Sequence, residues 1–125
     1  MAETYILAAM EALHFNTRDE LTRIELCHVA YFEANSNYTN VYYTNGSRFS
    51  LSRGISIVAD TIRSVNFVRL GRSHIVNIAY VQHINVPKRE LLLADLTVGH
   101  IFKLQLPKAV LRELKDMLEK ETGTP

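Results

Sequence analysis

The chain has 125 residues, of which 47% are hydrophobic and 22% charged, and a formal net charge of +1. This composition is that of one folded domain and excludes a disordered chain. The single cysteine, Cys27, excludes an intramolecular disulfide, and no apolar segment approaches the ~20 residues of a membrane span. We therefore expect a soluble cytoplasmic protein with no membrane partner.

The charges are unevenly distributed along the chain. Residues 1–34 carry six acidic and two basic residues, a net of −4, whereas residues 35–109 carry nine basic and three acidic residues, a net of +6. A basic middle within a neutral whole is typical of a one-sided anion-binding surface, although it also fits an ordinary charged surface.

The first half of the chain predicts a short helix followed by hairpins. Residues 1–13 form an N-terminal extension in which apolar side chains recur at helical spacing. Strands are then expected at 13–17, 21–26, 29–34, 38–43 and 48–51. The last two strands surround Asn45-Gly46, the preferred pair of a type I′ turn, in which both central residues have positive φ.

The second half predicts two helices and several further strands. Residues 52–65 switch to helical period, with Ser52 as the N-cap and a core-facing stripe that ends at Val65. Further strands are expected at 67–70, 75–78, 80–86, 90–93 and 100–106, followed by a helix that starts at Pro107 and a disordered tail at 121–125. The fold class is therefore mainly β, with antiparallel sheets, a mid-chain helix and a C-terminal helix in one domain over residues 14–120.

Enzyme and cofactor signatures are missing from the sequence. It contains no glycine-rich phosphate loop and no serine nucleophile elbow, and its acidic residues are scattered. No two of the five histidines share a helix-face spacing, so we expect no metal site, no cofactor and no catalytic residues. Cys27, His28 and His83 are expected to be structural residues of strands.

Two polar segments of the basic middle are candidates for contacts with nucleic acid. Arg69 and Arg72 flank a loop with Gly71 and Ser73, and arginine suits bidentate contact with guanine or phosphate, while Ser73 can donate to phosphate. For Arg69 an ion pair with Glu33 across a sheet is an equal alternative. The loop over residues 35–40 is short-chained and uncharged, and its asparagines and threonine suit contacts with adenine, thymine or phosphate.

These segments, in this order, resemble the LytTR-type DNA-binding domain of bacterial response regulators. The stretch Phe67-Val68-Arg69-Leu70-Gly71-Arg72-Ser73-His74-Ile75-Val76-Asn77 is similar to the family's Phe-x-Arg-x-His-Arg-Ser-Tyr-x-Val-Asn signature. Residues 24–39, the Asn45-Gly46 hairpin, the leucines at 91–93 and the closing helix also fit. The resemblance implies an elongated set of antiparallel sheets whose loops enter successive major grooves of DNA.

The resemblance also implies a contact set. Its members by position are Thr39 and Asn40 in the first loop, Arg72 in the second with Arg69 in support, and Lys108 near a third contact region after the last strand. The chemistry of the two polar segments adds Asn37 and Ser73 to these candidates. Gly71 stands where the family usually has His, His74 where it has Tyr or Phe, and Pro107-Lys108-Ala109 where it often has Ser-Arg-Arg. Because Lys cannot make the bidentate fork of Arg, these departures bear on the DNA site more than on the fold.

The functional expectation is sequence-specific binding of double-stranded DNA in transcription regulation. The family context implies promoter direct repeats, two copies on DNA, and an upstream sensor or receiver protein of a two-component system, with this chain working alone or as part of a longer regulator. Two alternatives are a β-rich protein-interaction module that has lost DNA binding, and a single-stranded nucleic-acid binder that uses Tyr38, Tyr42 and Tyr43 for stacking.

Overall fold

The structure is a computed structural model that describes residues 11–122 as ten strands, two α-helices and two short 3-10 turns. The elements are β1 (Ala12–Asn16), β2 (Leu21–Glu25), η1 (Leu26–His28), β3 (Val29–Asn35), β4 (Tyr38–Tyr43), β5 (Arg48–Leu51), α2 (Ile55–Thr61), β6 (Phe67–Leu70), β7 (His74–Asn77), η2 (Ile78–Tyr80), β8 (Val81–Asn85), β9 (Glu90–Ala94), β10 (Ile101–Gln105) and α3 (Lys108–Thr122).

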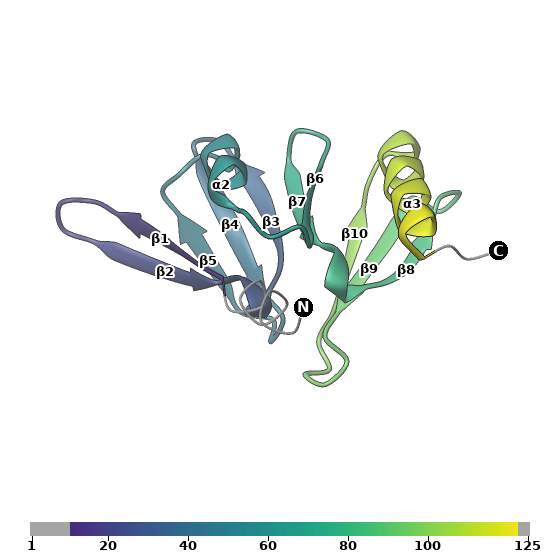
Figure 1. Cartoon of the computed structure of the whole chain (residues 1–125), viewed down its shortest axis with the longest axis horizontal. Coiled ribbons are helices and arrows are strands. Elements are labelled where there is room, and N and C mark those ends of the chain that lie inside the picture. The colour runs from purple at the N-terminus through teal and green to yellow at the C-terminus, as the bar shows by residue number, and fades with distance from the viewer. Residues whose placement is uncertain (1–10, 123–125) are drawn as a thin grey trace.

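The strands form three antiparallel sheets that follow one another along the longest axis of the molecule (Figure 1). They are a β1–β2 ribbon, a central sheet in the order β5-β4-β3-β7-β6, and a third sheet in the order β10-β9-β8. Most neighbours in a sheet are also neighbours in sequence, and the central pairing of β3 with β7 joins the two halves of the chain. The predicted fold class, mainly β with elongated antiparallel sheets and two helices, is confirmed.

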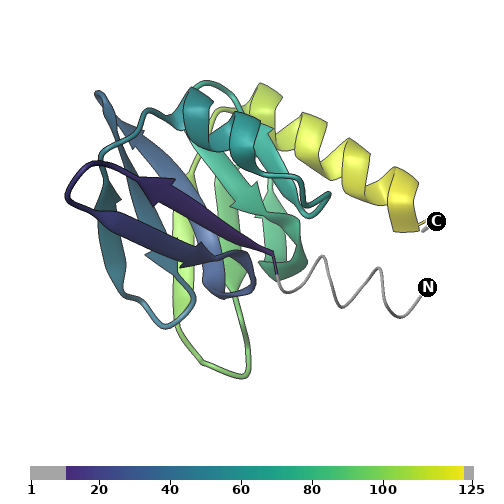
Figure 2. The ribbon, with the colours of Figure 1, turned by 60° about the vertical axis from the view of Figure 1, so that its left-hand side comes forward.

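The central sheet is covered on both faces, and each face has its own core. Phe32, Val41 and Ile75 lie on the face that packs against α2 and the β1–β2 ribbon. The opposite face places Tyr31 and Val76 against the third sheet and α3. Side chains of a strand alternate between faces, so one set of strands serves both cores. In Figure 2 both helices, α2 and α3, lie along the top of the view, although they pack into different cores.

Two predicted local structures differ from those observed. The helix α2 begins at Ile55 with Gly54 as its N-cap and no side-chain cap, so the prediction of Ser52 as N-cap is wrong. The helix also ends at Thr61, and Val65, expected in the core, is 84% exposed. Periodicity alone overestimated this helix, because its pattern continued into the loop toward β6.

The β4–β5 hairpin has a different turn from the predicted type I′. The N–H of Gly46 donates to the Tyr43 carbonyl at 2.9 Å, and the N–H of Tyr43 donates to the Ser47 carbonyl at 2.9 Å. Gly46 has φ 91°, whereas Asn45 has no positive φ. The glycine therefore follows the turn as a bulge residue, and the Asn45 side chain accepts hydrogen bonds from Ser47.

The predicted N-terminal helix and C-terminal tail overlap only in part with the described residues. The expected N-terminal helix lies mostly outside the described residues, and Leu13, placed at its end, is buried in β1. Two residues of the expected tail, 121 and 122, belong to α3, and the rest of the tail lies outside the described residues. None of the described helices is long and apolar enough to cross a membrane.

Candidate nucleic-acid interface

Three connections between elements meet along one edge of the molecule. The N–H of Ala34, near the end of β3, donates to the Ser73 carbonyl at 2.8 Å, so the β3–β4 turn and the β6–β7 turn are neighbours. A cavity of about 200 Å³ separates the β6–β7 turn from the β10–α3 connection and is lined by Arg72, Pro107 and Val110 among others. The β6–β7 turn projects between the two helices in Figure 1, at the top of the view. We call these connections, with the β8–β9 turn described next, the turn edge.

The β8–β9 turn joins the turn edge through its backbone. The N–H of Leu106, which follows β10, donates to the Arg89 carbonyl at 3.1 Å. Arg89 has φ 58°, a left-handed conformation that few non-glycine residues adopt. The neighbouring Lys88 and Arg89 are both exposed. Neither was among the predicted contact residues, and the sequence signal that could have found them is the basic pair in the turn after Pro87.

Four of the predicted contact residues are exposed at the turn edge. They are Asn37 in the β3–β4 turn, Arg72 and Ser73 in the β6–β7 turn, and Lys108 at the start of α3. Within residues 11–120, none of the cations Arg72, Lys88, Arg89 and Lys108 forms an ion pair. The edge therefore presents four unneutralised cations from three separate connections, which suits a polyanion.

The other two residues of the first predicted loop are buried in β4. Thr39 has no exposed surface, and its hydroxyl donates to the Arg53 carbonyl at 2.7 Å. Asn40 is 8% exposed and lies in register between Glu33 of β3 and Ser50 of β5. Both side chains are buried, because β4 begins at Tyr38, earlier than a loop over residues 35–40 would require, and both faces of the central sheet are covered there.

The Arg69 side chain links the β6–β7 turn to the helix α2. Its guanidinium donates to the Arg72 carbonyl at 3.2 Å and to the Ser56 hydroxyl of α2 at 3.3 Å. The alternative of an ion pair with Glu33 is not observed, because Arg69 lies opposite Ile75 on the face that packs against α2. Arg69 thus ties the backbone at Arg72 to the helix and orients the turn.

A polar cluster lies beneath the turn edge on the other face of the central sheet. The Glu33 carboxylate accepts a hydrogen bond from the Tyr42 hydroxyl at 3.1 Å and lies 3.4 Å from His74 Nε2. Tyr42 stacks on Tyr31 with ring centroids 4.3 Å apart. Burial, followed by the charges of Tyr42 and Glu33, raises the pKa of the Tyr31 hydroxyl well above its ordinary value. These contacts give the partly exposed Glu33 carboxylate partners on Tyr42 and His74, on the face of the central sheet opposite Arg69.

Asn77, the last residue of the signature-like stretch, is a structural residue. Its side chain is 4% exposed, donates to the Val29 carbonyl at 3.1 Å and accepts from the N–H of Ala79 at 3.1 Å. It therefore ties β7 to β3 and starts the η2 turn. The asparagine amide supplies both a donor and an acceptor, which this position needs.

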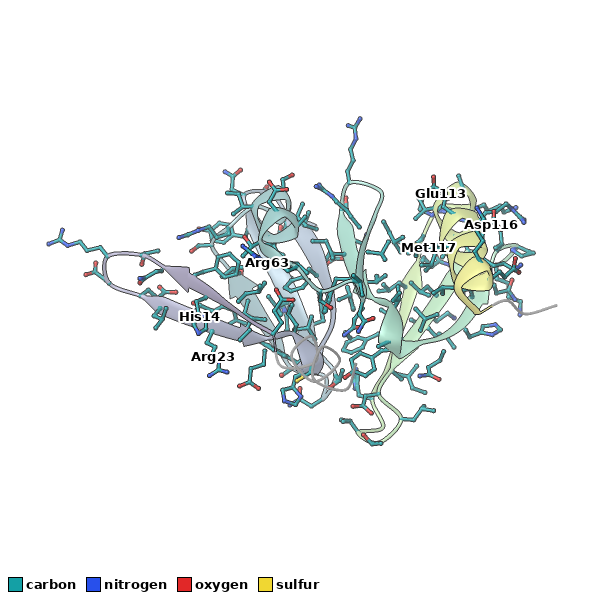
Figure 3. All side chains as sticks on the ribbon, viewed as in Figure 1. His14, Arg23, Arg63, Glu113, Asp116 and Met117 are labelled. Atoms are coloured by element: carbon teal, nitrogen blue, oxygen red, sulfur yellow. The ribbon has the colours of Figure 1, made fainter. Side chains whose placement is uncertain are left out.

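Figure 3 shows the side chains over the whole molecule, including Arg23 and His14 on the β1–β2 ribbon and Glu113 and Asp116 on α3. Within the described residues, the group of side chains that could hold a metal ion lies at the β2–β3 junction, at the opposite end of β3 from the turn edge. The exposed candidates of the turn edge are cationic, amide and hydroxyl side chains, which suit an anion better than a metal ion.

Comparisons with known proteins agree with this architecture. Residues 19–119 match a family model described as the LytTr DNA-binding domain. A solved LytTr DNA-binding domain from Bacillus cereus is similar, with a TM-score of 0.60 and 19% sequence identity over 86% of this chain and 95% of that chain. No curated protein matches the sequence. The structural likeness, at this identity, shows the fold.

Proposed function

Because this chain belongs to the LytTR family of DNA-binding domains, whose members bind DNA in transcription regulation, we propose that it recognises a specific double-stranded DNA sequence through the turn edge. The observation that carries the proposal is the alignment, along one edge of an elongated molecule, of three connections whose four cations form no ion pair within residues 11–120. Turns arranged in a row can enter successive major grooves on one side of a duplex without a recognition helix.

The proposed contacts divide into base-reading and phosphate-binding residues. Arg72 has the fork geometry for guanine, Asn37 the amide for adenine, and Ser73 and Lys108 suit phosphate. Lys88 and Arg89 extend the phosphate contacts beyond the β10–α3 connection. The predicted residues Thr39 and Asn40 are buried in β4 and are left out of the proposed contacts, and Arg69 positions the turn that carries Arg72.

The wider regulatory setting is part of the same proposal. A bacterial two-component system, an upstream sensor or receiver protein, and two copies on promoter direct repeats are the arrangement that the family resemblance implies. No catalytic role is proposed, because the turn edge combines cations and amides without a nucleophile and base.

The single-stranded alternative is disfavoured by the positions of its tyrosines. Tyr42 is stacked on Tyr31 in the core between the sheets and Tyr43 packs against the other core, which leaves Tyr38 as the exposed ring of the three. A row of stacking platforms is therefore not formed. Competition of the bound duplex by single strands of the same sequence would separate the two modes.

The direct test begins with selection of bound fragments from a random duplex library. Arg72→Ala is then expected to weaken binding of the selected duplex by roughly one to two decades, since a base contact is worth about 1–3 kcal/mol. Arg18→Ala, in the exposed turn of the β1–β2 ribbon, is the matched control and is expected to bind as the wild type. Fluorescence anisotropy gives the affinities, and circular dichroism shows that both variants fold.

Two outcomes would overturn the proposal. Equal binding by Arg72→Ala and the wild type would remove the turn edge as the contact surface. Absence of duplex binding at low salt would favour the protein-interaction module, for which the ion-pair-free edge would then face a protein.

A further inference from the structure

The junction between β2 and β3 brings a carboxylate, a thiol and an imidazole together. Glu25 ends β2, and Cys27 and His28 lie in the η1 turn, rather than in a strand as predicted. The ligand-type atoms of these three side chains lie within 4.8 Å of one another. We propose that this junction binds a divalent transition metal ion of the zinc class, contrary to the expectation from sequence spacing that the chain has no metal site.

The distances fit a tetrahedral ion with little movement. Ligands about 2.0–2.3 Å from zinc at the tetrahedral angle are about 3.3–3.8 Å from one another. Glu25 Oε2 and His28 Nε2 are 3.4 Å apart, so one ion can bridge them where they stand. Arg23 contacts the other carboxylate oxygen, Oε1, at 3.3 Å and leaves Oε2 directed at the imidazole. The thiol needs to approach by at most about 1.3 Å, because sulfur and its neighbouring ligand atoms are about 3.5 Å apart in a tetrahedral zinc site. A partial rotation about the Cα–Cβ bond of Cys27 supplies a movement of this size.

The backbone of the junction is held in place without a metal. The N–H of Leu26 donates to the Glu11 carbonyl at 3.0 Å, and the N–H of Thr44 donates to the His28 carbonyl at 2.8 Å. Between them, the Tyr80 hydroxyl donates to the Cys27 carbonyl. The Leu26 side chain is buried and anchors the same turn in the core. A metal would therefore meet ligands on a fixed turn rather than order a flexible loop.

An ion at the junction would be accessible from solvent and would keep one coordination position open. The side chains of Glu25 and His28 are 46% and 65% exposed. They line a cavity of about 520 Å³ with Arg23, Thr44 and Asn45 among its other residues. Three protein ligands then leave a fourth position for water at the cavity.

The donor set selects the class of metal. Thiolate and imidazole favour zinc and its neighbours in the first transition row, whereas calcium and magnesium prefer oxygen ligands alone. Coordination displaces the thiol proton of Cys27 into solvent, and the resulting thiolate forms the metal–sulfur bond. The Glu25 carboxylate and the thiolate together offset the ion's charge, while Arg23 remains on Oε1.

The proposed metal site is independent of the DNA proposal. The seven residues of β3 separate it from the β3–β4 turn by about 20 Å at the rise of an extended strand. A bound ion would therefore lie at the opposite edge of the central sheet from the turn edge. Metal binding and duplex binding can be measured on the same variants, and either can fail without the other.

Cobalt(II) is the probe, titrated into the reduced full chain while absorption is followed. We expect one equivalent to bind with a near-ultraviolet band of a cobalt–thiolate bond, and zinc to displace it. Cys27→Ser should abolish the band, and His28→Gln and Glu25→Gln should each weaken binding by about tenfold or more. His83→Gln, at an exposed histidine of β8, is the matched control and should bind cobalt as the wild type does.

The proposal is overturned if excess cobalt gives no thiolate band, or if the band survives Cys27→Ser. Equal losses in His83→Gln and His28→Gln would also overturn it, because they would indicate scattered surface binding. Metal-free duplex affinity and circular dichroism of every variant should match the wild type, which separates loss of ligands from loss of fold.

Discussion

At the scale of residues, the side chains exposed at the turn edge are those that lie beyond the ends of the strands. Asn37 is exposed in a two-residue turn next to Ser36, which adopts φ 54°. Two positions later, Thr39 is fully buried. The first candidate loop therefore contains fewer surface side chains than its polar sequence indicates. Its polar residues therefore differ in position: Asn37 is exposed at the turn, whereas the Thr39 hydroxyl forms a hydrogen bond in the interior.

The role of Thr39 can be tested by removing its hydroxyl while keeping its shape. Thr39→Val leaves the Arg53 carbonyl without its donor, and we expect the free energy of unfolding to fall by about 1–3 kcal/mol. Affinity for the selected duplex should stay the same under conditions where the variant is folded. Urea unfolding and fluorescence anisotropy measure the two effects. A loss of affinity at unchanged stability would instead place Thr39 in contact with DNA.

Gly71 permits the shape of the β6–β7 turn. Its φ is 62°, and a Cβ there would meet only Val110 at 3.8 Å, so backbone conformation rather than space limits substitution. Gly71→Ala should lower the free energy of unfolding by about 1 kcal/mol, measured by urea denaturation. Gly71→Asn should lose less, because asparagine tolerates the left-handed region. Equal losses for the two variants would contradict this account.

At the scale of elements, the short helix α2 is stabilised by burial of its side chains rather than by capping of its ends. The helix α2 has seven residues and no side-chain cap, yet it covers one core of the central sheet through Ile55 and Val58. Burial of these side chains, rather than intrinsic propensity, therefore stabilises it. Its connection to the β6–β7 turn through the Ser56–Arg69 hydrogen bond makes the helix part of the support of the turn edge.

The N-cap of α2 offers a stabilising substitution. Gly54→Ser would supply the missing side-chain acceptor for the free N–H groups, and we expect the free energy of unfolding to rise by a few tenths of a kcal/mol. Thermal and urea unfolding measure the change. Ser52→Ala is the control, because the exposed Ser52 side chain is not the cap, and it should leave stability unchanged. A loss of stability in Ser52→Ala without a gain in Gly54→Ser would instead indicate that Ser52 caps the helix.

At the scale of the whole molecule, the core between the central and third sheets fixes the positions of the turns. Tyr31 and Tyr42 are stacked there, and the edge of the Phe102 ring from β10 meets both. The same core connects the β6–β7 turn to the β10–α3 connection through Leu70 and Leu106. Rigid packing of the two sheets therefore sets the spacing between the turns of the turn edge.

Burial of Tyr31 predicts a loss of stability in alkali. The pKa of the Tyr31 hydroxyl is raised in the folded state, so the unfolded chain loses this proton first as pH rises. The contribution of the hydroxyl to the free energy of unfolding is therefore complete below the unfolded pKa of about 10 and falls as pH rises beyond it. Tyr31→Phe should make this decline shallower by up to about 1.4 kcal/mol per pH unit. Urea unfolding at a series of alkaline pH values measures the slope. Tyr38→Phe, at an exposed ring, controls for the loss of a hydroxyl, and an unchanged slope in Tyr31→Phe would refute the assignment.

The four cations of the turn edge predict the salt dependence of duplex binding. If Lys88, Arg89 and Lys108 each neutralise one phosphate while Arg72 reads a base, the logarithm of affinity should fall with the logarithm of salt concentration with a slope of about −3. Lys88→Gln or Arg89→Gln should each reduce that slope by about one, because these residues are proposed to contact phosphate. Anisotropy titrations at several salt concentrations give the slopes. Arg18→Gln should leave the slope as it is, and a wild-type slope near zero would contradict the proposed surface.

The sequence by itself determined the order of most strands, the closing helix and the family. Alternation of apolar side chains and the signature-like stretch are local properties, and they predict strands such as β6 and β7 within a residue or two. Arg72, Ser73 and Lys108 were also predictable as exposed candidates, because they flank glycine or proline at the ends of strands. Local pattern gave no reliable end for α2, where apolar spacing continued past the last helical residue.

Only the tertiary structure decided which polar residues reach the surface and which distant segments meet. Thr39 and Asn40 are buried because both faces of the central sheet are covered at β4, a fact of layer packing that polarity does not reveal. Arg89 joins the turn edge through a backbone hydrogen bond to Leu106. Glu25, Cys27 and His28 converge because the 3-10 turn η1 interrupts the strand, in which the side chains of residues 25 and 28 would point to opposite faces. Each depends on the path of the backbone in space, which spacing along the chain does not specify.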